Sequence, residues 1–209
     1  RLRQDWLDSP LGLVRGDSGR LVLYAINDTA EQEGIRAGMT LADARAILPS
    51  LKTSETDLPA ETKTLSYLAN WCCRYTPWTA TDEEGSGIQF AGGGSIWLDV
   101  TGCTHLFDSE DAMMRDIVNC LSNIGFKTHA AIADTPGSAW AAARYKHHKH
   151  RRWTIVRKGR AQDILASIPI AGLRLAPEVI SDLQAVGLSH IGDLMPIPRS
   201  VLADRFGST

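Results

Sequence analysis

Between residues 87 and 156 the spacing of apolar residues switches repeatedly between two residues and a helical spacing, and this alternation constrains the fold most. A spacing of two is typical of strands, and spacings of three and four are typical of helices. The expected elements are strands at 87–91 and 95–101, a helix at 108–124, a strand at 127–133, a helix at 136–145 and a strand at 153–156. This order predicts an α+β fold with a ferredoxin-type sheet and helices on one face.

The residues on either side of this region predict shorter elements. Before it, we expect a strand at 21–25, a helix from Thr40 that stops at Pro49, a polar connection at 51–60 and a helix that ends before Pro77. After residue 157 the strand signals disappear, and proline and glycine separate short helical pieces. We therefore place a domain boundary near residues 157–160.

Charge is unevenly distributed, although 22 Lys and Arg nearly balance 24 Asp and Glu. Residues 81–114 contain seven acidic residues and no Lys or Arg, whereas residues 127–160 contain nine Lys or Arg and only Asp134 as an acid. The cations are densest in RYKHHKHRRW, residues 144–153. A cluster of this kind favours binding to a phosphate backbone, and a solvated basic loop without a dedicated role is the alternative.

Neither the histidines nor the cysteines predict a metal site. His147, His148 and His150 are neighbours that diverge on a regular element, and no Asp, Glu or Cys lies nearby in sequence. The four cysteines form no CxxC pair, which favours buried thiols in a reducing cytosol. No apolar run approaches the roughly 18–20 residues that span a bilayer, and no signal peptide is visible, so we expect a protein without a membrane partner.

Three stretches together resemble the Y-family (translesion) DNA polymerases. GIRAGMTLADARAILPSL at 34–51 is similar to the fingers segment, SIWLDVTGC at 95–103 to the second catalytic strand, and SDLQAVGLSHIGDLMPIPRSVLADRFG at 181–207 to the helix-hairpin-helix of the thumb. WLDVTGCTHLF and AIADTPGSAWAAAR resemble a catalytically inactive, polymerase-like branch of that family, which belongs to a bacterial mutagenesis cassette.

The resemblance implies a domain organisation. Residues 1–157 would form the palm and fingers, with the fingers at about 27–60 and the first palm strand apparently missing. Residues 158–209 would form a thumb-like helix-hairpin-helix region, truncated before a C-terminal domain.

The positions that carry catalysis in active relatives hold other residues here. Nucleotidyl transfer uses two metal ions held by clustered carboxylates. The family's Asp-Glu pair aligns with Gly94 and Ser95, and Asp99 aligns with a position that is not the principal metal ligand. The Tyr and Arg that hold the triphosphate align with Asp28 and Glu31, which would repel it. The resemblance therefore implies an inactive site that needs no cofactor.

The thumb motif is also altered. A helix-hairpin-helix usually offers glycine-rich backbone amides to a phosphate, but the matching residues here are Arg174, Leu175 and Ala176. Arg174 can reach a phosphate only through its side chain. The DNA-binding residues expected from the sequence are Arg144, Lys146, Lys149, Arg151, Arg152 and Arg174.

These features predict a non-catalytic protein that binds damaged DNA as an adaptor in damage-induced mutagenesis, in the bacterial cytoplasm at the nucleoid. The resemblance implies a sliding clamp, a RecA-like accessory protein and an error-prone replicative-type polymerase as its partners. One alternative is an active DNA-directed DNA polymerase that uses Mg²⁺ on displaced ligands such as Asp82, Glu83 and Glu84. Another is a palm-like nucleotide-binding module unrelated to replication, against which the thumb-like C-terminus argues.

Overall fold

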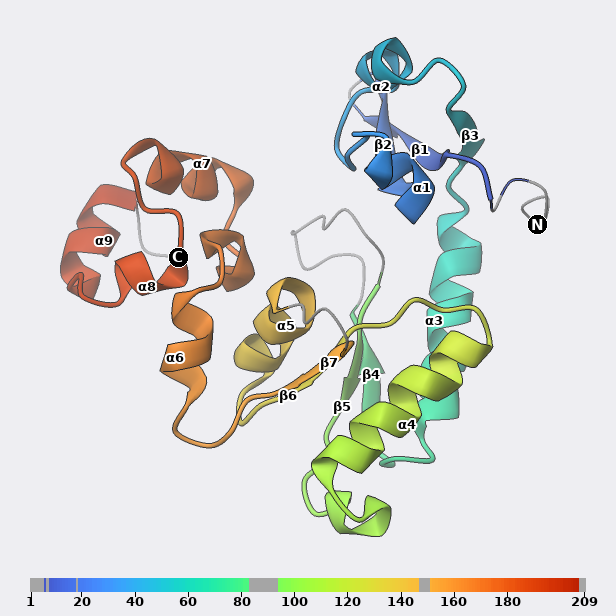
Figure 1. Cartoon of the computed structure of the whole chain (residues 1–209). Helices are drawn as coiled ribbons and strands as arrows, with labels where there is room; N and C mark the ends of the chain where they lie inside the picture. The colour runs from blue at the N-terminus through green and yellow to red at the C-terminus, as the bar shows by residue number, and fades with distance from the viewer. Residues whose placement is uncertain (1–5, 7, 18, 83–93, 147–150, 207–209) are drawn as a thin grey trace. The chain divides into compact units, whose positions relative to one another are not determined.

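The computed structural model describes residues 6, 8–17, 19–82, 94–146 and 151–206. Its chain forms two compact units, Arg1–Asp99 and Val100–Thr209 (Figure 1).

The first unit opens with a three-stranded sheet in the order β2-β1-β3. Its strands are β1 (Leu11–Asp17), β2 (Arg20–Ile26) and β3 (Lys52–Glu55). β1 runs antiparallel to β2 and parallel to β3. The strand expected at 21–25 is confirmed as β2, but the polar connection expected at 51–60 is wrong. β3 has the sequence KTSE, and it forms because its backbone pairs with β1 at the edge of the sheet, without an apolar pattern.

Two short helices pack on this sheet, α1 (Asp28–Gln32) and α2 (Leu41–Ile47). Asn27 joins α1 to β1, because its Oδ1 accepts hydrogen bonds from the amides of Ala30 and Leu11, each at 3.0 Å. Thr40 caps α2 by accepting from the amide of Asp43 at 3.1 Å, which confirms the predicted start of that helix. The core between them is apolar and consists of Val14, Leu23, Ala30, Ile35, Ala44 and Leu51.

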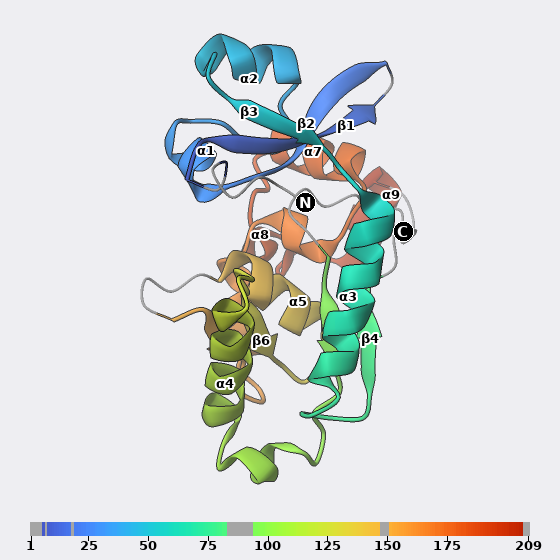
Figure 2. The same cartoon turned by 90° about the vertical axis from the view of Figure 1, so that its right-hand side faces the viewer.

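A longer helix and a small ladder complete the first unit. Helix α3 (Leu58–Cys72), capped by Asp57, packs beside strands β4 (Thr79–Thr81) and β5 (Ile96–Leu98) (Figure 2). β4 and β5 pair antiparallel, with Ala80 opposite Trp97. The predicted helix before Pro77 and the predicted strand around Leu98 are confirmed. The partner strand expected at 87–91 lies outside the described residues.

The second unit begins with two helices that alternate with a parallel pair of strands. It starts with the 3₁₀ segment η2 (Thr104–Phe107). The elements that follow are α4 (Glu110–Asn123), β6 (Ala130–Ile132), α5 (Pro136–Tyr145) and β7 (Trp153–Ile155). Ser109 caps α4 by accepting from the amide of Ala112, and Gly125 follows its end with φ +91°. The helices and strands predicted between 108 and 156 are therefore confirmed.

The ladders in this part of the chain are shorter than the predicted sheet. β6 pairs with β7 in parallel, and each of the ladders β4–β5 and β6–β7 has two strands. In the described ranges, the predicted ferredoxin-type layer is therefore not one continuous hydrogen-bonded sheet. Each of these strands is only three residues long, so few backbone groups are available to extend a ladder.

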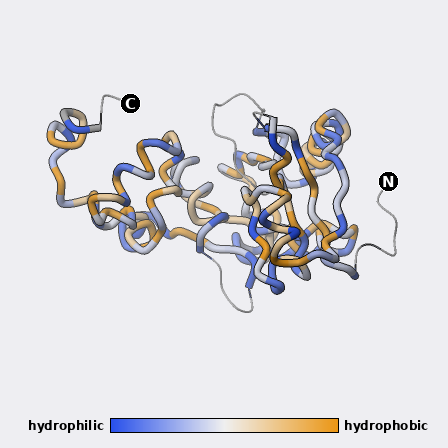
Figure 3. The backbone as a smooth tube through the Cα atoms, turned by 90° about the horizontal axis from the view of Figure 1, so that it is seen from above, coloured by the Kyte–Doolittle hydropathy of each residue, from blue (hydrophilic) through white to orange (hydrophobic). Residues whose placement is uncertain are grey.

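The rest of the second unit is helical, as predicted. Its elements are α6 (Ala161–Ala166), the 3₁₀ segment η3 (Ile170–Leu173), α7 (Pro177–Ala185), α8 (Ile191–Leu194) and α9 (Arg199–Phe206). Two glycines allow close packing: a Cβ at Gly172 would lie 2.6 Å from Ile168, and one at Gly192 would lie 2.8 Å from the carbonyl oxygen of Ala166. Hydrophobic and hydrophilic residues alternate along the chain (Figure 3). Among the described helices, none has both the length and the apolar composition needed to cross a bilayer.

Candidate catalytic positions and nucleic-acid interface

Gly94, the first expected catalytic position, lies two residues before β5 and against helix α3. A Cβ atom at Gly94 would overlap Cδ1 of Leu65 and would lie 3.0 Å from its Cδ2. Carbon atoms repel strongly at such separations, so Leu65 must move before residue 94 can carry any side chain. An apolar side chain therefore occupies the space next to the backbone where the resemblance places a metal-binding carboxylate in active relatives.

The acidic residues that flank the β4–β5 ladder lie at its opposite ends. The amide of Asp82 donates to the carbonyl of Ser95 at 2.9 Å, and the amide of Asp99 donates to the carbonyl of Trp78 at 3.0 Å. Four residue steps separate these two ends, which is about 13 Å at about 3.3 Å per residue. Two-metal sites hold their ions about 3.5–4 Å apart, so these two carboxylates are not arranged as such a site.

The described residues contain no group of three or more His, Cys, Asp or Glu side chains able to hold a metal ion. Asp82 instead accepts a hydrogen bond from Nε1 of Trp97 at 3.2 Å. Glu83 and Glu84, the other ligands considered under the polymerase alternative, lie outside the described residues.

The positions expected to meet a triphosphate are together on α1. Asp28 and Glu31 are three residues apart in this helix, so they lie on the same side of it, and both are exposed. Nη1 of Arg36, just after this helix, donates to the backbone carbonyls of Glu31 and Ile35, both at 2.8 Å. Two carboxylates here oppose the binding of a negatively charged triphosphate.

Two of the expected DNA-binding residues meet at one indole ring. Trp140 lies in α5 with only 3% of its surface exposed. The guanidinium carbon of Arg144 is 4.9 Å from the centroid of this ring, and that of Arg174 is 5.4 Å away. Cations at these distances are attracted by the ring quadrupole. The structure therefore brings together two arginines that are 30 residues apart in the sequence.

Arg174 also has an unusual backbone. It follows η3 with φ 59° and ψ 33°, in the left-handed region that favours glycine. It occupies the hairpin with Leu175 and Ala176, where the family motif usually has glycine. The chain therefore keeps a glycine-like turn at this point while it presents an arginine side chain.

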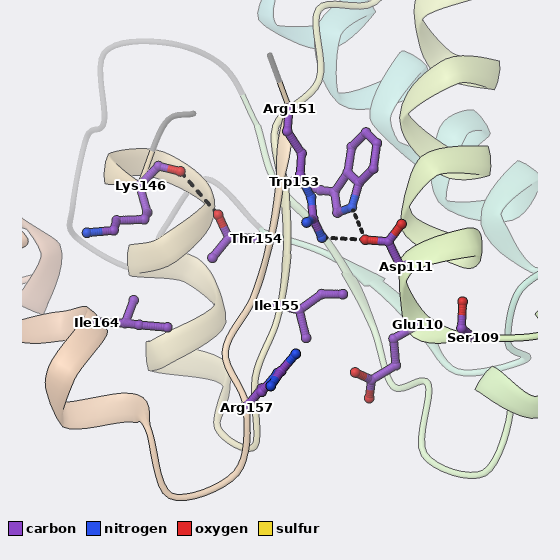
Figure 4. A pocket seen from close by; sticks show the side chains of 10 residues that line it. All are labelled: Ser109, Glu110, Asp111, Lys146, Arg151, Trp153, Thr154, Ile155, Arg157 and Ile164. Carbon is purple, nitrogen blue, oxygen red and sulfur yellow. Dashed lines mark hydrogen bonds and ion pairs between the residues drawn. The ribbon is translucent and has the colours of Figure 1, made fainter. Parts of the chain in front are cut away.

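Arg151, by contrast, is paired with an acidic residue. Its Nη2 lies 2.5 Å from Oδ1 of Asp111 in α4, and the same oxygen accepts from Nε1 of Trp153 at 3.2 Å (Figure 4). The side chains of Arg151 and Asp111 are 40% and 47% exposed. Because Asp111 already balances its charge, we expect Arg151 to contribute less to phosphate binding than an unpaired arginine would.

The Arg151–Asp111 pair lines a groove of about 550 Å³ between α4, β7 and α6 (Figure 4). The groove also contains Glu110, Lys146 and Arg157. Charges of both signs thus face it, so it is not a uniformly basic surface.

The remaining expected cations bond to hydroxyl groups or lie outside the described residues. Nζ of Lys146 donates to Oγ of Ser167 at 2.9 Å, and Nη2 of Arg152 donates to Oγ of Ser122 at 3.0 Å. These hydroxyl groups carry no charge, so the two hydrogen bonds do not balance the positive charges of Lys146 and Arg152. Lys149 lies outside the described residues, as do His147, His148 and His150.

Near the hairpin, a carboxylate stabilises the start of α8. Asp193 accepts hydrogen bonds from the amides of His190 and Ser189 at 2.8 and 2.9 Å. These backbone hydrogen bonds, that of His190 first, lower the pKa of the Asp193 carboxyl. Asp193 thus acts as a structural cap of the helical region that follows Arg174.

The cysteines are all free, but only Cys72 is buried. Burial raises the pKa of its thiol to about 11. The expectation of buried cysteines is wrong for Cys73, which is exposed, because successive residues of a helix point about 100° apart. Cys103 and Cys120 are partly buried.

Sequence reasoning did not identify three residues that define these sites: Leu65, Asp111 and Trp140. The helical spacing marks Leu65 as apolar but not as the neighbour of Gly94. Asp111 lies 40 residues from Arg151, and no local pattern signals that pair. An arginine four residues after Trp140 in a helix was the one available signal, because such residues are neighbours on its surface.

The fold is that of the N-terminal catalytic part of Y-family DNA polymerases. The insertion ternary complex of Dbh DNA polymerase superposes with a TM-score of 0.75, covering 98% of this chain and 58% of its own at 17% identity. The crystal structure of DinB from Sulfolobus solfataricus superposes with a TM-score of 0.73, covering 98% of this chain and 57% of its own at 17% identity.

The sequence places the chain within a family. The model of the impB/mucB/samB family (IMS) matches residues 2–144, and the chain belongs to this family. Protein ImuB of Caulobacter vibrioides is 37% identical over 174 residues, which are 83% of this chain and 35% of that protein. DNA polymerase IV of Salmonella arizonae is 24% identical over 201 residues, which are 96% of this chain and 54% of that protein. The chain thus spans about a third to a half of the length of these relatives.

Proposed function

We propose that this chain is the palm, fingers and thumb part of an ImuB-type polymerase-like protein that lacks nucleotidyl-transfer activity and binds damaged DNA as an adaptor in translesion synthesis. The observation that carries this proposal is the contact between Gly94 and Leu65. Metal-dependent phosphoryl transfer needs a carboxylate next to this strand, and the leucine fills the space that the first atoms of such a side chain would occupy.

The acidic side of α1 supports the same proposal. If one oxygen of Asp28 or Glu31 lay 4 Å from a phosphate charge, the repulsion would be about 1–4 kcal/mol, between the values for water and for a protein surface. A polymerase that had only moved its metal ligands would still need to hold the nucleotide. Under this proposal a carboxylate is missing at Gly94, where a metal ion would need it. Two carboxylates are present at Asp28 and Glu31, where they repel the triphosphate. Both differences act against catalysis.

The domain organisation is part of the proposal. Residues 1–157 serve as palm and fingers around a ferredoxin-type layer, the fingers lie at about 27–60, and residues 158–209 serve as the thumb. The match to the N-terminal part of Dbh polymerase supports this assignment, because it extends over 98% of the chain.

DNA binding is the activity that the basic residues support. Arg144, Lys146, Lys149, Arg152 and Arg174 are the proposed phosphate contacts, and Arg151 has a smaller share because of Asp111. Phosphate contacts position a protein on DNA without reading its sequence, which suits a protein that acts at lesions of varied structure.

The proposed partners are inferred from the similarity to ImuB. The relatives are longer than this chain, and their additional residues provide room for contacts with partners. The whole protein would join a sliding clamp, a RecA-like accessory protein and an error-prone replicative-type polymerase at the nucleoid in the bacterial cytoplasm. The proposal does not assign the binding of these partners to any of the described residues.

An active polymerase is the second candidate, supported by the similarity to DNA polymerase IV over nearly the whole chain. Crystals of the full-length protein soaked with Mn²⁺ and a nonhydrolysable deoxynucleoside triphosphate distinguish the two. The adaptor proposal predicts no ordered metal pair near Gly94. A pair of Mn²⁺ ions coordinated by this chain, with the triphosphate bound, would overturn it in favour of the polymerase.

A further inference from the structure

The outer side of helix α3 faces away from the β4–β5 ladder and carries aromatic residues. On the inner side, Leu65 lies against Gly94, and Ala69 is only 7% exposed. Tyr67 and Trp71 each come two residues after one of these inner residues. Two residues correspond to about 200° around a helix, so both rings lie on the outer side.

Two cations accompany these rings. Nζ of Lys63 lies 5.9 Å from the ring centroid of Tyr67, and the guanidinium carbon of Arg74 lies 4.1 Å from that of Trp71. The ring quadrupole attracts cations at such distances. We call Lys63, Tyr67, Trp71 and Arg74 the α3 stripe.

Part of the α3 stripe is already ordered, and part is openly exposed. Trp71 packs edge-on against Tyr75, with ring centroids 5.8 Å apart, and Tyr75 is only 2% exposed. Arg74 in turn stacks on Trp71. Side chains that are held in this way lose little conformational entropy when a partner binds. Tyr67, by contrast, is 64% exposed, which is a large area for an aromatic side chain without a partner.

The α3 stripe is basic. Residues 62–81 contain Lys63 and Arg74 but no Asp or Glu. Glu61 comes one helical turn before Leu65, so it belongs to the inner side of the helix. A surface that covers the stripe must therefore supply negatively charged groups to complement the two cations.

The arrangement of the α3 stripe favours a protein over single-stranded DNA as its occupant. Tyr67, Trp71 and Arg74 have the i, i+4, i+7 spacing of helices that bind in a groove of another protein. Tyr, Trp and Arg are also the residue types that contribute most to protein–protein binding. Single-stranded nucleic acids bind in positively charged grooves. A helix side is convex, and its two cations are about 16 Å apart along the axis, at about 1.5 Å per residue.

We propose that the α3 stripe docks in a groove of a protein partner, where apolar side chains receive Tyr67 and Trp71 and a carboxylate accepts from Arg74. A guanidinium that stacks on a ring still presents its N–H donors in its own plane, where a carboxylate can bind in a bidentate manner. This inference rests on the proposed function, because one of the three protein partners named there is the expected occupant.

Binding to the three proposed partners tests the docking. The full-length protein is titrated separately with the sliding clamp, the RecA-like accessory protein and the error-prone polymerase, from 50 to 300 mM KCl. For one partner, Tyr67→Ala should weaken binding roughly 5- to 30-fold, as expected for a residue central to an interface. Arg74→Glu should weaken the same complex at least as much, because it places two carboxylates opposite each other. Its affinity should also fall less with salt than that of wild type.

Leu106→Ala and Arg20→Glu are the matched controls. Leu106 is 69% exposed, close to the value for Tyr67, and Arg20 is an exposed arginine at the start of β2. Both variants should bind every partner as tightly as wild type does. Tyr67 and Arg74 are themselves exposed, so their replacement should leave the unfolding curve close to that of wild type.

Each remaining outcome overturns the inference. Wild-type affinity of Tyr67→Ala and Arg74→Glu for every partner that binds removes the inference and leaves the proposed function standing, and so do equal losses in the two controls. If no partner binds wild type, the inference fails together with the partners of the proposed function. The same variants are also titrated with an oligothymidylate. Weaker binding to this probe, with partner binding unchanged, would assign the α3 stripe to single-stranded DNA instead.

Discussion

The surroundings of Gly94 and those of Trp140 correspond to two kinds of site, metal-dependent catalysis and phosphate binding. These differ in how exactly the side chains must be arranged. A two-metal site needs several carboxylates at one point, whereas Gly94 has no side chain and the end of Leu65 lies beside it. Phosphate binding needs only cations at a surface, so it tolerates replacement of a glycine-rich hairpin by Arg174. Under the proposed function, a polymerase fold loses its catalysis through a few substitutions and keeps the means to bind DNA.

The largest expected effect concerns the basic cluster after α5. Replacing Lys149, Arg151 and Arg152 with Ala should reduce the slope of log K against log salt by roughly two to three, at about 0.7–0.9 per contact. Because Asp111 already pairs with Arg151, we expect the lower end of this range. Fluorescence anisotropy with a primer–template duplex between 50 and 300 mM salt measures the slope.

A triple variant with the same loss of charge provides the control. Arg157, Lys158 and Arg160 are exposed and follow β7, outside the proposed contacts, so their replacement with Ala should change the slope much less. Equal losses in the two triple variants would show that binding depends on net charge and not on this cluster.

The next effect tests the crowding at the catalytic position. Gly94→Ala should lower the free energy of unfolding by about 0.5–1.5 kcal/mol, because its Cβ forces the end of the half-buried Leu65 side chain out of its present rotamer. In a Leu65→Ala background the same change should cost much less. Urea unfolding of the two single variants and the double variant measures this coupling.

Gly16→Ala is the matched control, because a Cβ at Gly16 meets no atom within 4 Å. If Gly94→Ala were as stable as wild type, Leu65 would move aside easily, and the contact would not explain the loss of a carboxylate there.

A smaller effect separates the paired arginine from the others. Asp111→Asn should free Arg151 and steepen the salt dependence of DNA binding by up to about 0.9 in slope. Its cost in stability should be about 0–1 kcal/mol, since both partners are substantially exposed. Asp163→Asn breaks an ion pair of the same length with Arg160 and should leave the slope unchanged. A slope that stays constant in Asp111→Asn would mean that Arg151 never meets a phosphate.

The smallest effect is the pH dependence contributed by Asp193. Because its pKa is lowered in the folded state, the carboxylate stabilises the fold above its ordinary pKa of 3.8, and this contribution is lost as the pH falls through the lowered value. Asp193→Ala should therefore be less stable than wild type at neutral pH, and the difference should shrink in acid. Thermal unfolding across this pH range measures it, and a difference that is independent of pH would contradict the assigned cause.

The helices were predictable because their signals are local. Thr40, Pro136 and Gly125 mark helix ends through caps and backbone preferences that operate within a few residues. Strand β3 was not predictable, because its polar residues are held by backbone pairing with a distant strand.

The candidate sites show the same distinction. The expectation that Gly94 and Ser95 replace the Asp-Glu pair comes from the resemblance to the family motif. The contact between Gly94 and Leu65 depends on tertiary packing between α3 and the start of β5. Similarly, the basic cluster is visible in the sequence, whereas its division into a paired Arg151 and a stacked Arg144 arises only when α4, α5 and the hairpin fold together.

The central claim is that catalysis is absent while DNA binding is retained. The most direct test measures both on one sample: the full-length protein is titrated onto a labelled primer–template at low salt, and at saturation the four deoxynucleoside triphosphates are added with Mg²⁺ or Mn²⁺. We predict full binding without extension of the primer, under conditions in which a DNA polymerase IV extends it. Primer extension by the protein would contradict the account.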